Sequence, residues 1–274
     1  MHTRPRVVAH RGASEVEAEH TLAAYHRAVD DGADGLECDV RLTRDGVLVC
    51  VHDRRIDRTS SGRGLVSALE LTDLAELDFG SWHYTARGDV GDDEVDHGEA
   101  PDRDRSGVLT LARLLEAAVD RGRPLELAIE TKHPTRYAGL VEIALVELLA
   151  RFNLDRPDPE SPVRPRVMSF ASSSLRRLRG MAPGLPTVFL MDRVPLRFRD
   201  GSLPAGAVAA GPALRVLRAH PSYVERVHAM GGEVHVWTVD EPDDVELVCS
   251  LGVDVIITNR PAAVLAQLAE LAAP

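Results

Sequence analysis

Acidic, basic and imidazole side chains recur in this sequence where short apolar runs end. The residues at such positions are His10, Arg11, Glu37, Asp39, His52, Glu130 and Lys132. Lys132 is the single lysine among 32 basic residues, so an ammonium group is kept where the chain otherwise uses arginine. Chemistry that depends on several charged groups at once is therefore expected at these run ends.

The carboxylates among them suggest a metal site. Side chains alternate along a strand, so Glu37 and Asp39 share one face of their strand, as Glu130 and Lys132 do on another. If the two strands meet, each close pair of carboxylates costs about 4 kcal/mol at 4 Å and an effective dielectric constant of about 20. Either protonation or a bound cation must relieve this repulsion. A site with only oxygen ligands favours Mg²⁺ or Ca²⁺ over zinc.

The histidines and cations add acid–base chemistry and anion binding. An imidazole titrates near neutrality, so His10 and His52 could serve as a proton acceptor and a proton donor. Arg11 and Lys132 bring positive charge to the same place. A compact ammonium group fits between a carboxylate and a phosphoryl oxygen more easily than a forked guanidinium does. Together these groups predict a site for a phosphate ester.

The elements that must position these residues alternate between strand and helix. Period-2 and period-3.6 patterns predict strands over 6–10, 35–42, 46–53, 125–132, 166–170, 187–191, 207–211, 233–240 and 253–259. They predict helices over 21–32, 109–122, 136–151, 172–181, 221–230, 241–250 and 261–271. About eight β–α units in 274 residues favour a closed (β/α)8 barrel, a TIM barrel, whose working residues stand at the carboxyl ends of the strands. An open nucleotide-binding sheet would commonly carry G-x-G-x-x-G after its first strand, where this chain has "HRGAS".

One stretch interrupts this alternation. Residues 54–108 contain no clear β–α unit, and we expect them to be an insertion in a single barrel domain that spans 1–274. Within the insertion, 86–107 is rich in acidic residues and glycine and is predicted to be a mobile acidic loop. Its spacing does not match the calcium-binding loop of an EF-hand.

Composition restricts the classes of partner. A formal net charge of −11 disfavours a nucleic-acid-binding surface. Three cysteines are too few, and odd in number, for a disulfide framework, and no apolar run is long enough to span a membrane. We expect a cytoplasmic protein with a small-molecule substrate and no stable membrane insertion. The oligomeric state is left open.

The chain resembles the glycerophosphodiester phosphodiesterase family. The stretches that carry the resemblance, in order from residue 7 to about 261, are "VVAHRGAS", "HTLAAYHRAVDDGADGLECDVRLTRDGVLVCVHD", "LAIETK", "VHVWTVD" and "GVDVIITNRP". The resemblance implies a barrel with an insertion after its second β–α region. It implies an acid–base pair of His10 and His52 and a metal held by Glu37, Asp39 and Glu130. It also implies phosphate contacts from Arg11 and Lys132 and a glycerol-facing Trp237.

Two positions are less certain members of the site. The family usually has Glu-Asn-Thr after the first loop, where this chain has Glu19-His20-Thr21, so the roles of Glu19 and His20 are open. Asn259 also follows an apolar strand, but it is interpreted as a turn residue before "RP".

The expected activity is metal-dependent hydrolysis of glycerophosphodiesters to glycerol 3-phosphate and an alcohol. One histidine would take the proton of the neighbouring glycerol hydroxyl as that oxygen attacks phosphorus, and the other would protonate the leaving alcohol. Water would then open the cyclic phosphate, with direct attack by water as the competing path. The head-group preference, the choice between Mg²⁺ and Ca²⁺ and the division of labour between the histidines stay open.

Two alternatives remain beside this activity. One is a lysophospholipase D-like or sphingomyelinase D-like enzyme that acts on lipids. The insertion is mostly charged, with only Phe79, Trp82 and Tyr84 as an aromatic cluster, which argues against a membrane-facing rim. The other is a non-catalytic protein that binds a phosphate ligand. None of the expected chemical groups is missing from the sequence, which argues against that class.

Overall fold

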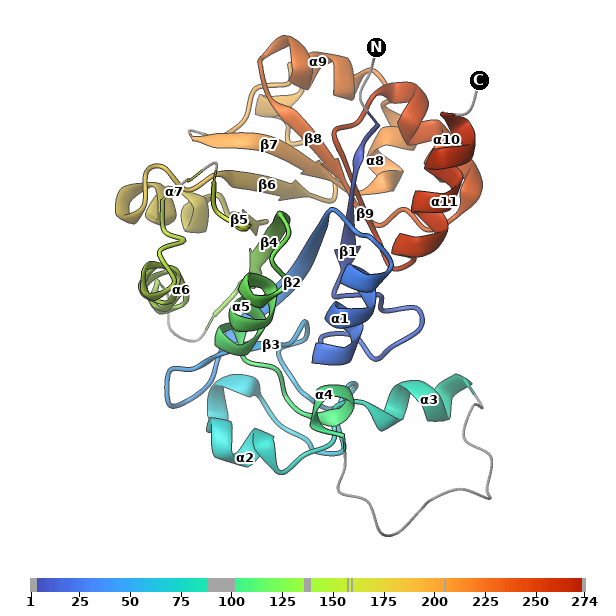
Figure 1. Ribbon diagram of the computed structural model, residues 1–274. Coiled ribbons are helices and arrows are strands. Elements are labelled where there is room, and N and C mark those ends of the chain that lie inside the picture. Colours follow the sequence, from blue (N-terminus) through green and yellow to red (C-terminus); the bar gives the residue numbers. More distant parts are fainter. Residues whose placement is uncertain are drawn as a thin grey trace.

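Eight parallel strands form a closed barrel in the computed structural model, which describes residues 4–87, 102–135, 139–156, 158, 160–204 and 206–272 (Figure 1). The barrel strands are β1 (Arg6–His10), β2 (Gly35–Leu42), β4 (Leu125–Thr131), β5 (Val163–Ser169), β6 (Thr187–Met191), β7 (Ala207–Pro212), β8 (Glu233–Val236) and β9 (Val255–Thr258). Closure comes from β1, which pairs in parallel with both β2 and β9. The predicted (β/α)8 fold is therefore confirmed.

The strand predicted at 46–53 is shorter and lies outside the barrel. The structure has β3 (Leu48–Cys50), which pairs antiparallel with β2. A tight turn joins the two strands, with the Thr43 amide donating to the Val47 carbonyl at 3.0 Å. So short a connection permits an antiparallel hairpin, whereas a parallel strand would need a long crossover.

Helices surround the barrel and follow most of its strands. They are α1 (Leu22–Asp30), α5 (Leu111–Asp120), α6 (Leu140–Arg151), α7 (Ser172–Met181), α8 (Leu214–Ala219), α9 (Tyr223–Ala229), α10 (Pro242–Leu251) and α11 (Pro261–Leu271). Sequence patterns do not predict α8, because its six residues are too few to show a helical period. Among the described residues, no helix combines the length and the apolar character needed to cross a membrane.

The segment between β3 and α5 has its own small core. It contains η1 (Val66–Ala68), α2 (Leu71–Ala75), α3 (Ser81–Arg87) and α4 (Arg103–Ser106). A separate apolar cluster supports it, made of Val49, Val51, Ile56, Val66, Leu74 and Phe79. The acidic loop predicted at 86–107 falls largely on residues 88–101, which lie outside the described residues.

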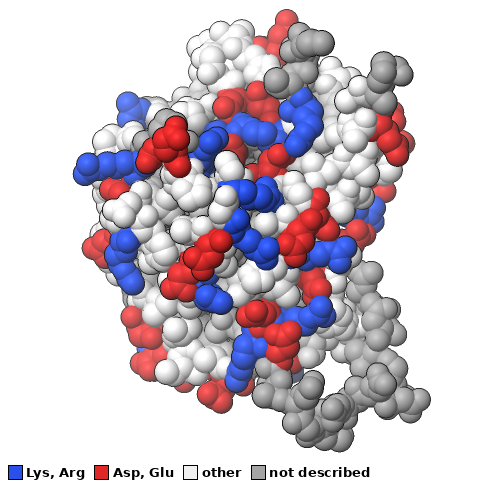
Figure 2. Space-filling view, viewed as in Figure 1, with Lys and Arg blue, Asp and Glu red and all other residues white. Residues whose placement is uncertain are grey.

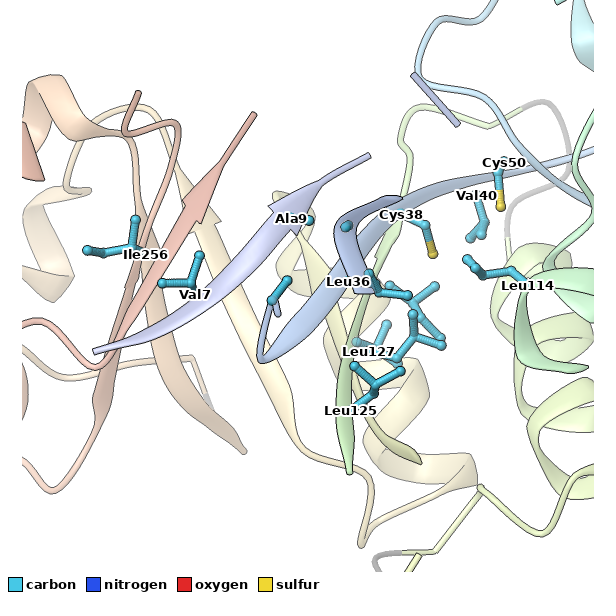
Figure 3. Close-up of a cluster of buried hydrophobic side chains, with 14 of the residues drawn as sticks. Val7, Ala9, Leu36, Cys38, Val40, Cys50, Leu114, Leu125, Leu127 and Ile256 are labelled. Atoms are coloured by element: carbon cyan, nitrogen blue, oxygen red, sulfur yellow. The ribbon is translucent and has the colours of Figure 1, made fainter. Parts of the chain in front are cut away.

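Alternation along the strands divides the core into two layers. Leu36, Cys38 and Val40 of β2 point outward, toward a layer that includes Leu114 of α5 (Figure 3). Val8 and Ile257 instead belong to a smaller cluster inside the barrel. Because Glu37 and Asp39 alternate with the outward-pointing side chains, they face the barrel interior.

The amino-terminal end of the barrel is filled with paired charges. Glu233 accepts from Arg6 at 2.8 Å, from Arg166 at 2.9 Å and from the His235 ring at 2.9 Å. Glu126 also contacts Arg6. These partners neutralise one another, so this end of the barrel has a structural role and leaves the carboxyl end for chemistry.

Candidate active site

A cavity of about 250 Å³ opens at the carboxyl ends of the barrel strands. Its walls are formed by His10, Arg11, Glu37, His52, Glu130, Lys132, Met168, Phe170, Leu190, Asp192, Trp237 and Ile257. All of the predicted site residues except Asp39 are in this wall, and Asp39 is bonded to two of them. The structure therefore brings the predicted set together.

The turn after β1 delivers Arg11 to the carboxylates. Arg11 has a positive φ of 59°, and its amide donates both to the Glu37 carbonyl at 3.1 Å and to Glu37 Oε2 at 3.0 Å. Gly12 follows with φ of 85°, and a Cβ there would lie 2.6 Å from the backbone of Ala24. Only glycine fits this close approach, so the glycine of "HRG" shapes the turn.

Three carboxylates converge because of strand register. Asp39 of β2 lies directly opposite Glu130 of β4, and Glu37 stands two residues earlier on the same face. One oxygen from each residue lies within 4.8 Å of the others, and all three residues are buried. Such a set of oxygens fits a hard divalent cation, as the sequence predicts.

Two positively charged side chains, those of Lys132 and Arg11, lie against these carboxylates. Lys132 Nζ is 2.9 Å from Asp39 Oδ1 and 2.9 Å from Glu130 Oε1. Arg11 Nε is 3.0 Å from Asp39 Oδ2. Lys132 is buried, and although burial alone would lower its pKa, the two carboxylates outweigh burial and raise it. Its ammonium group therefore stays charged inside the site.

This environment shifts the pKa values of the three carboxylates in different directions. Burial would raise the pKa of Asp39, but Lys132, His20 and Arg11 hold that pKa well below its ordinary value. Burial and the neighbouring Asp39 raise the pKa of Glu130 to about 8 and raise that of Glu37 well above its usual range. Lys132 and Arg11 thus compensate Asp39 more completely than Glu37 and Glu130, and a divalent cation would supply the missing positive charge.

The His10 ring is held by Asn259, a strand-end residue that the sequence analysis interpreted as part of a turn. His10 Nδ1 is 2.7 Å from Asn259 Oδ1, while Asn259 Nδ2 donates to Asp240 Oδ2 at 2.7 Å. Because the Asn259 oxygen must accept, His10 Nδ1 carries the hydrogen, and Nε2 is left with its lone pair. Burial, followed by Arg11, lowers the pKa of His10 to about 4. The position of Asn259 at the end of a predicted strand is the sequence signal for this role, although the turn interpretation was preferred.

The His52 ring has a carboxylate partner. His52 Nδ1 is 2.7 Å from Asp53 Oδ1, and Asp53 Oδ2 accepts from Arg58 Nε at 2.6 Å. Arg58 also donates to both oxygens of Glu19, at 2.9 Å and 2.8 Å. Burial lowers the pKa of His52, while Asp53 opposes that shift. Sequence patterns do not single out Arg58, because it follows no predicted strand.

Glu19 and His20, whose roles the sequence left open, both contact residues of the site. Glu19 accepts from Arg11 Nη1 at 3.1 Å. His20 is buried, with Nε2 3.0 Å from Asp39 Oδ2 and Nδ1 2.8 Å from the hydroxyl of Tyr25. His20 thus orients a candidate metal ligand and does not line the cavity.

One wall of the cavity is apolar. Trp237 Nε1 donates to the Gly211 carbonyl at 2.8 Å, which fixes the indole ring. Phe170 packs edge-to-face against Trp237, with ring centroids 5.5 Å apart. Leu190 and Ile257 complete this side. A substrate would thus meet charged groups on one wall and carbon on the other.

Comparison with known proteins identifies a family that matches this chain. Residues 10–263 match the model of the glycerophosphoryl diester phosphodiesterase family. A Mycobacterium tuberculosis protein named "Probable glycerophosphodiester phosphodiesterase 1" is 47% identical over 258 residues, which cover 94% of this chain and 90% of that protein. A glycerophosphodiester phosphodiesterase of Bacillus subtilis is 32% identical over 93% of this chain and 83% of its own length.

Solved structures agree on the fold. A phosphodiesterase of Oleispira antarctica in complex with the product sn-glycerol-3-phosphate superposes with a TM-score of 0.79 at 23% identity, over 97% of both chains. A glycerophosphodiester phosphodiesterase of Agrobacterium tumefaciens gives a TM-score of 0.72 at 24% identity, over 96% of this chain and all of that one. By its sequence match and the curated relatives, this chain belongs to the glycerophosphoryl diester phosphodiesterase family, a family of enzymes.

Proposed function

We propose that this enzyme hydrolyses glycerophosphodiesters to glycerol 3-phosphate and an alcohol. The observation that carries the proposal is one cavity that combines two imidazoles, an arginine and a lysine beside three carboxylates lying within 4.8 Å of one another. These are the groups that phosphodiester cleavage needs for proton transfer and for charge stabilisation. The named activities of the relatives agree with it.

The two histidines have different environments, which supports a division of labour. His10 Nε2 retains a lone pair and is assigned as the base that takes the proton of the glycerol hydroxyl next to the phosphate. His52 shares a hydrogen bond with the Asp53 carboxylate, which stabilises a protonated ring, so His52 is assigned as the acid.

In the first step the glycerol oxygen forms a bond to phosphorus, and the bond from phosphorus to the leaving alcohol breaks. His52 gives its proton to the departing oxygen. Water then opens the cyclic phosphate with the two roles reversed. Direct attack by water on the diester is the competing path.

The charged residues hold the phosphate. Arg11 and Lys132 would contact its oxygens, and Trp237 would pack against the carbon skeleton of glycerol. Glu37, Asp39 and Glu130 would hold one divalent cation, Mg²⁺ or Ca²⁺, in keeping with the general dependence of the family on such ions. Stabilisation of negative charge on the phosphoryl oxygens is the chemistry that this cation supplies when bound.

Two wider assignments belong to the same proposal. Residues 1–274 are taken as a single barrel domain with an insertion at about 54–108, supported by one apolar layer that runs around the described barrel. A cytoplasmic location is supported by Cys38, Cys50 and Cys249, which are all free thiols.

The test is an assay of glycerol 3-phosphate release from glycerophosphocholine in Mg²⁺ or Ca²⁺. We expect His10→Ala and His52→Ala each to lower kcat by about 10²–10⁴-fold, because each removes one proton-transfer group. His26→Ala, outside the cavity, is the matched control, and circular dichroism checks that the variants are folded. Wild-type activity in either site variant would overturn the assignment. Faster cleavage of lysophosphatidylcholine would favour the lipid-directed alternative.

A further inference from the structure

A second hollow, the arginine groove, lies beside the active-site cavity. It has a volume of about 620 Å³, and its walls come from the loop after β6 and from α8 and α9. Its charged lining consists of Arg193, Arg199, Arg215 and Arg226 with one carboxylate, Asp192. The size suits a small-molecule group.

Asp192 connects the two hollows. It directly follows Met191, the last residue of β6, and it lines both the active-site cavity and the arginine groove. Its Oδ1 accepts from Nη2 of the groove residue Arg215 at 2.6 Å. A substrate that extends past Asp192 therefore enters the arginine groove.

The arginine groove is positively charged, whereas the protein as a whole is negatively charged. Four arginines against one aspartate leave a formal excess of three positive charges, in a chain of net charge −11. On the face shown in Figure 2, by contrast, basic and acidic side chains are interspersed over the described part. An excess of one sign in a concave site concentrates ligands of the opposite charge.

Several guanidinium groups in the groove keep unused hydrogen-bond donors. Within the described part of the chain, Arg193 and Arg199 form no ion pair. Arg226 Nη1 donates to the Ser222 hydroxyl at 2.8 Å, but its Nε is buried with no hydrogen-bond partner. A phosphate matches the planar fork of a guanidinium, and a phosphate bound in the groove would accept hydrogen bonds from the exposed Arg193 and Arg199.

We infer that the arginine groove binds a phosphate carried by the leaving alcohol, so that glycerophosphodiesters with a further phosphate on the alcohol are preferred substrates. This inference rests on the proposed function. The reaction is unchanged: water is added across the same phosphodiester bond, giving glycerol 3-phosphate and a phosphorylated alcohol. The second phosphate is bound and not cleaved.

The experiment compares two substrates that differ by one phosphate, glycerophosphoinositol and glycerophosphoinositol 4-phosphate. We expect wild-type kcat/KM to be about tenfold higher for the phosphorylated substrate, the size of one or two charge-assisted hydrogen bonds. Arg193→Gln combined with Arg199→Gln should remove most of this preference and leave turnover of glycerophosphoinositol unchanged. Arg156→Gln combined with Arg176→Gln, two exposed arginines outside the groove, is the charge-matched control and should keep the preference.

The outcomes separate the two proposals. Equal kcat/KM for both substrates would overturn the assignment of the groove while the proposed function stands. If neither inositol substrate is cleaved while glycerophosphocholine is, this inference is overturned and the proposed function stands. If glycerophosphocholine also releases no glycerol 3-phosphate, the proposed function fails and this inference fails with it. Inorganic phosphate is titrated as well. A change in glycerophosphoinositol turnover that depends on Arg193 and Arg199, without a preference between substrates, would assign the groove to a free anion and overturn the inference.

Discussion

The positive charge of Lys132 partly neutralises the carboxylates that a divalent metal ion would also neutralise. Its ammonium group lies 2.9 Å from a carboxylate oxygen on each of two strands, at a buried position. A guanidinium is wider and planar, so it could not take the same place without moving Asp39 or Glu130. The use of the chain's single lysine at this position follows from the space between the two carboxylates.

Lys132→Met is expected to lower the Tm of the metal-free protein by several degrees, because about 1 kcal/mol changes Tm by roughly 2–4 °C in proteins near this size. Added Mg²⁺ or Ca²⁺ should then raise Tm more in the variant than in the wild type, since lysine and cation compensate the same carboxylates. Thermal unfolding with and without chelator measures both effects. Arg176→Met, which removes one exposed positive charge outside the cavity, is the control and should leave the metal-induced shift as in the wild type. Equal metal-induced shifts in Lys132→Met and the wild type would contradict this account.

At the scale of elements, Arg58 joins two loops that each carry part of the site. It bonds Asp53, the partner of His52, and Glu19, the partner of Arg11. Its guanidinium also lies over the Trp82 ring of α3, 5.9 Å from the centroid. The segment after β3 thus holds the His52 loop and the loop after β1 in one arrangement. We interpret Arg58 as a positioning residue that acts through Asp53 and Glu19.

Arg58→Gln should raise the pKa of His52, which burial lowers in the folded protein. The sign follows because removal of a cation next to Asp53 strengthens the hold of that carboxylate on a protonated imidazole, while Asp39, Arg11 and Lys132 stay in place. A proton NMR titration of the His52 ring measures the shift. We expect kcat to fall by about tenfold with a smaller change in KM, as the acid is less well oriented. An unchanged His52 titration would show that Arg58 only supports the loop.

The two ends of the barrel have different roles: one contributes to stability, and the other carries the candidate active site. Arg6 and His10 are the first and last residues of β1, and Glu126 and Glu130 stand near opposite ends of β4. One end therefore holds a paired network around Glu126 and Glu233, and the other holds the cavity. Interactions with His235 and the arginines lower the pKa of Glu233 to about 2, so Glu233 keeps its charge at ordinary pH values.

Glu126→Gln should lower the free energy of unfolding by about 1.5–3 kcal/mol, the range for a hydrogen bond to a charged group. Arg6 and Arg166 would each lose a carboxylate partner at a half-buried position. Because the cavity lies at the other end, kcat should stay within a factor of about two, a small difference on the free-energy scale of catalysis. Denaturant midpoints and steady-state kinetics test the two halves separately. A large loss of kcat with unchanged stability would contradict the separation of the two ends.

Local pattern in the sequence was enough to identify the barrel strands and the residues at their ends. Strands β1, β2 and β6 begin and end where the apolar runs do, and His10, Glu37 and Glu130 were expected from strand alternation and position alone. The reason is that period and strand ends are properties of a few consecutive residues. Six-residue α8 and antiparallel β3 were missed or misplaced because their signals are short.

Only the tertiary structure decided which partners these residues meet. The pairing of Asn259 with His10 and of Arg58 with Glu19, and the opening of the arginine groove beside Asp192, join residues far apart in the chain. Strand register and loop packing set these contacts, and neither is written in any local run of residues. The sequence therefore determined which chemical groups face the barrel mouth, while the closure of the barrel determined how they are oriented toward one another.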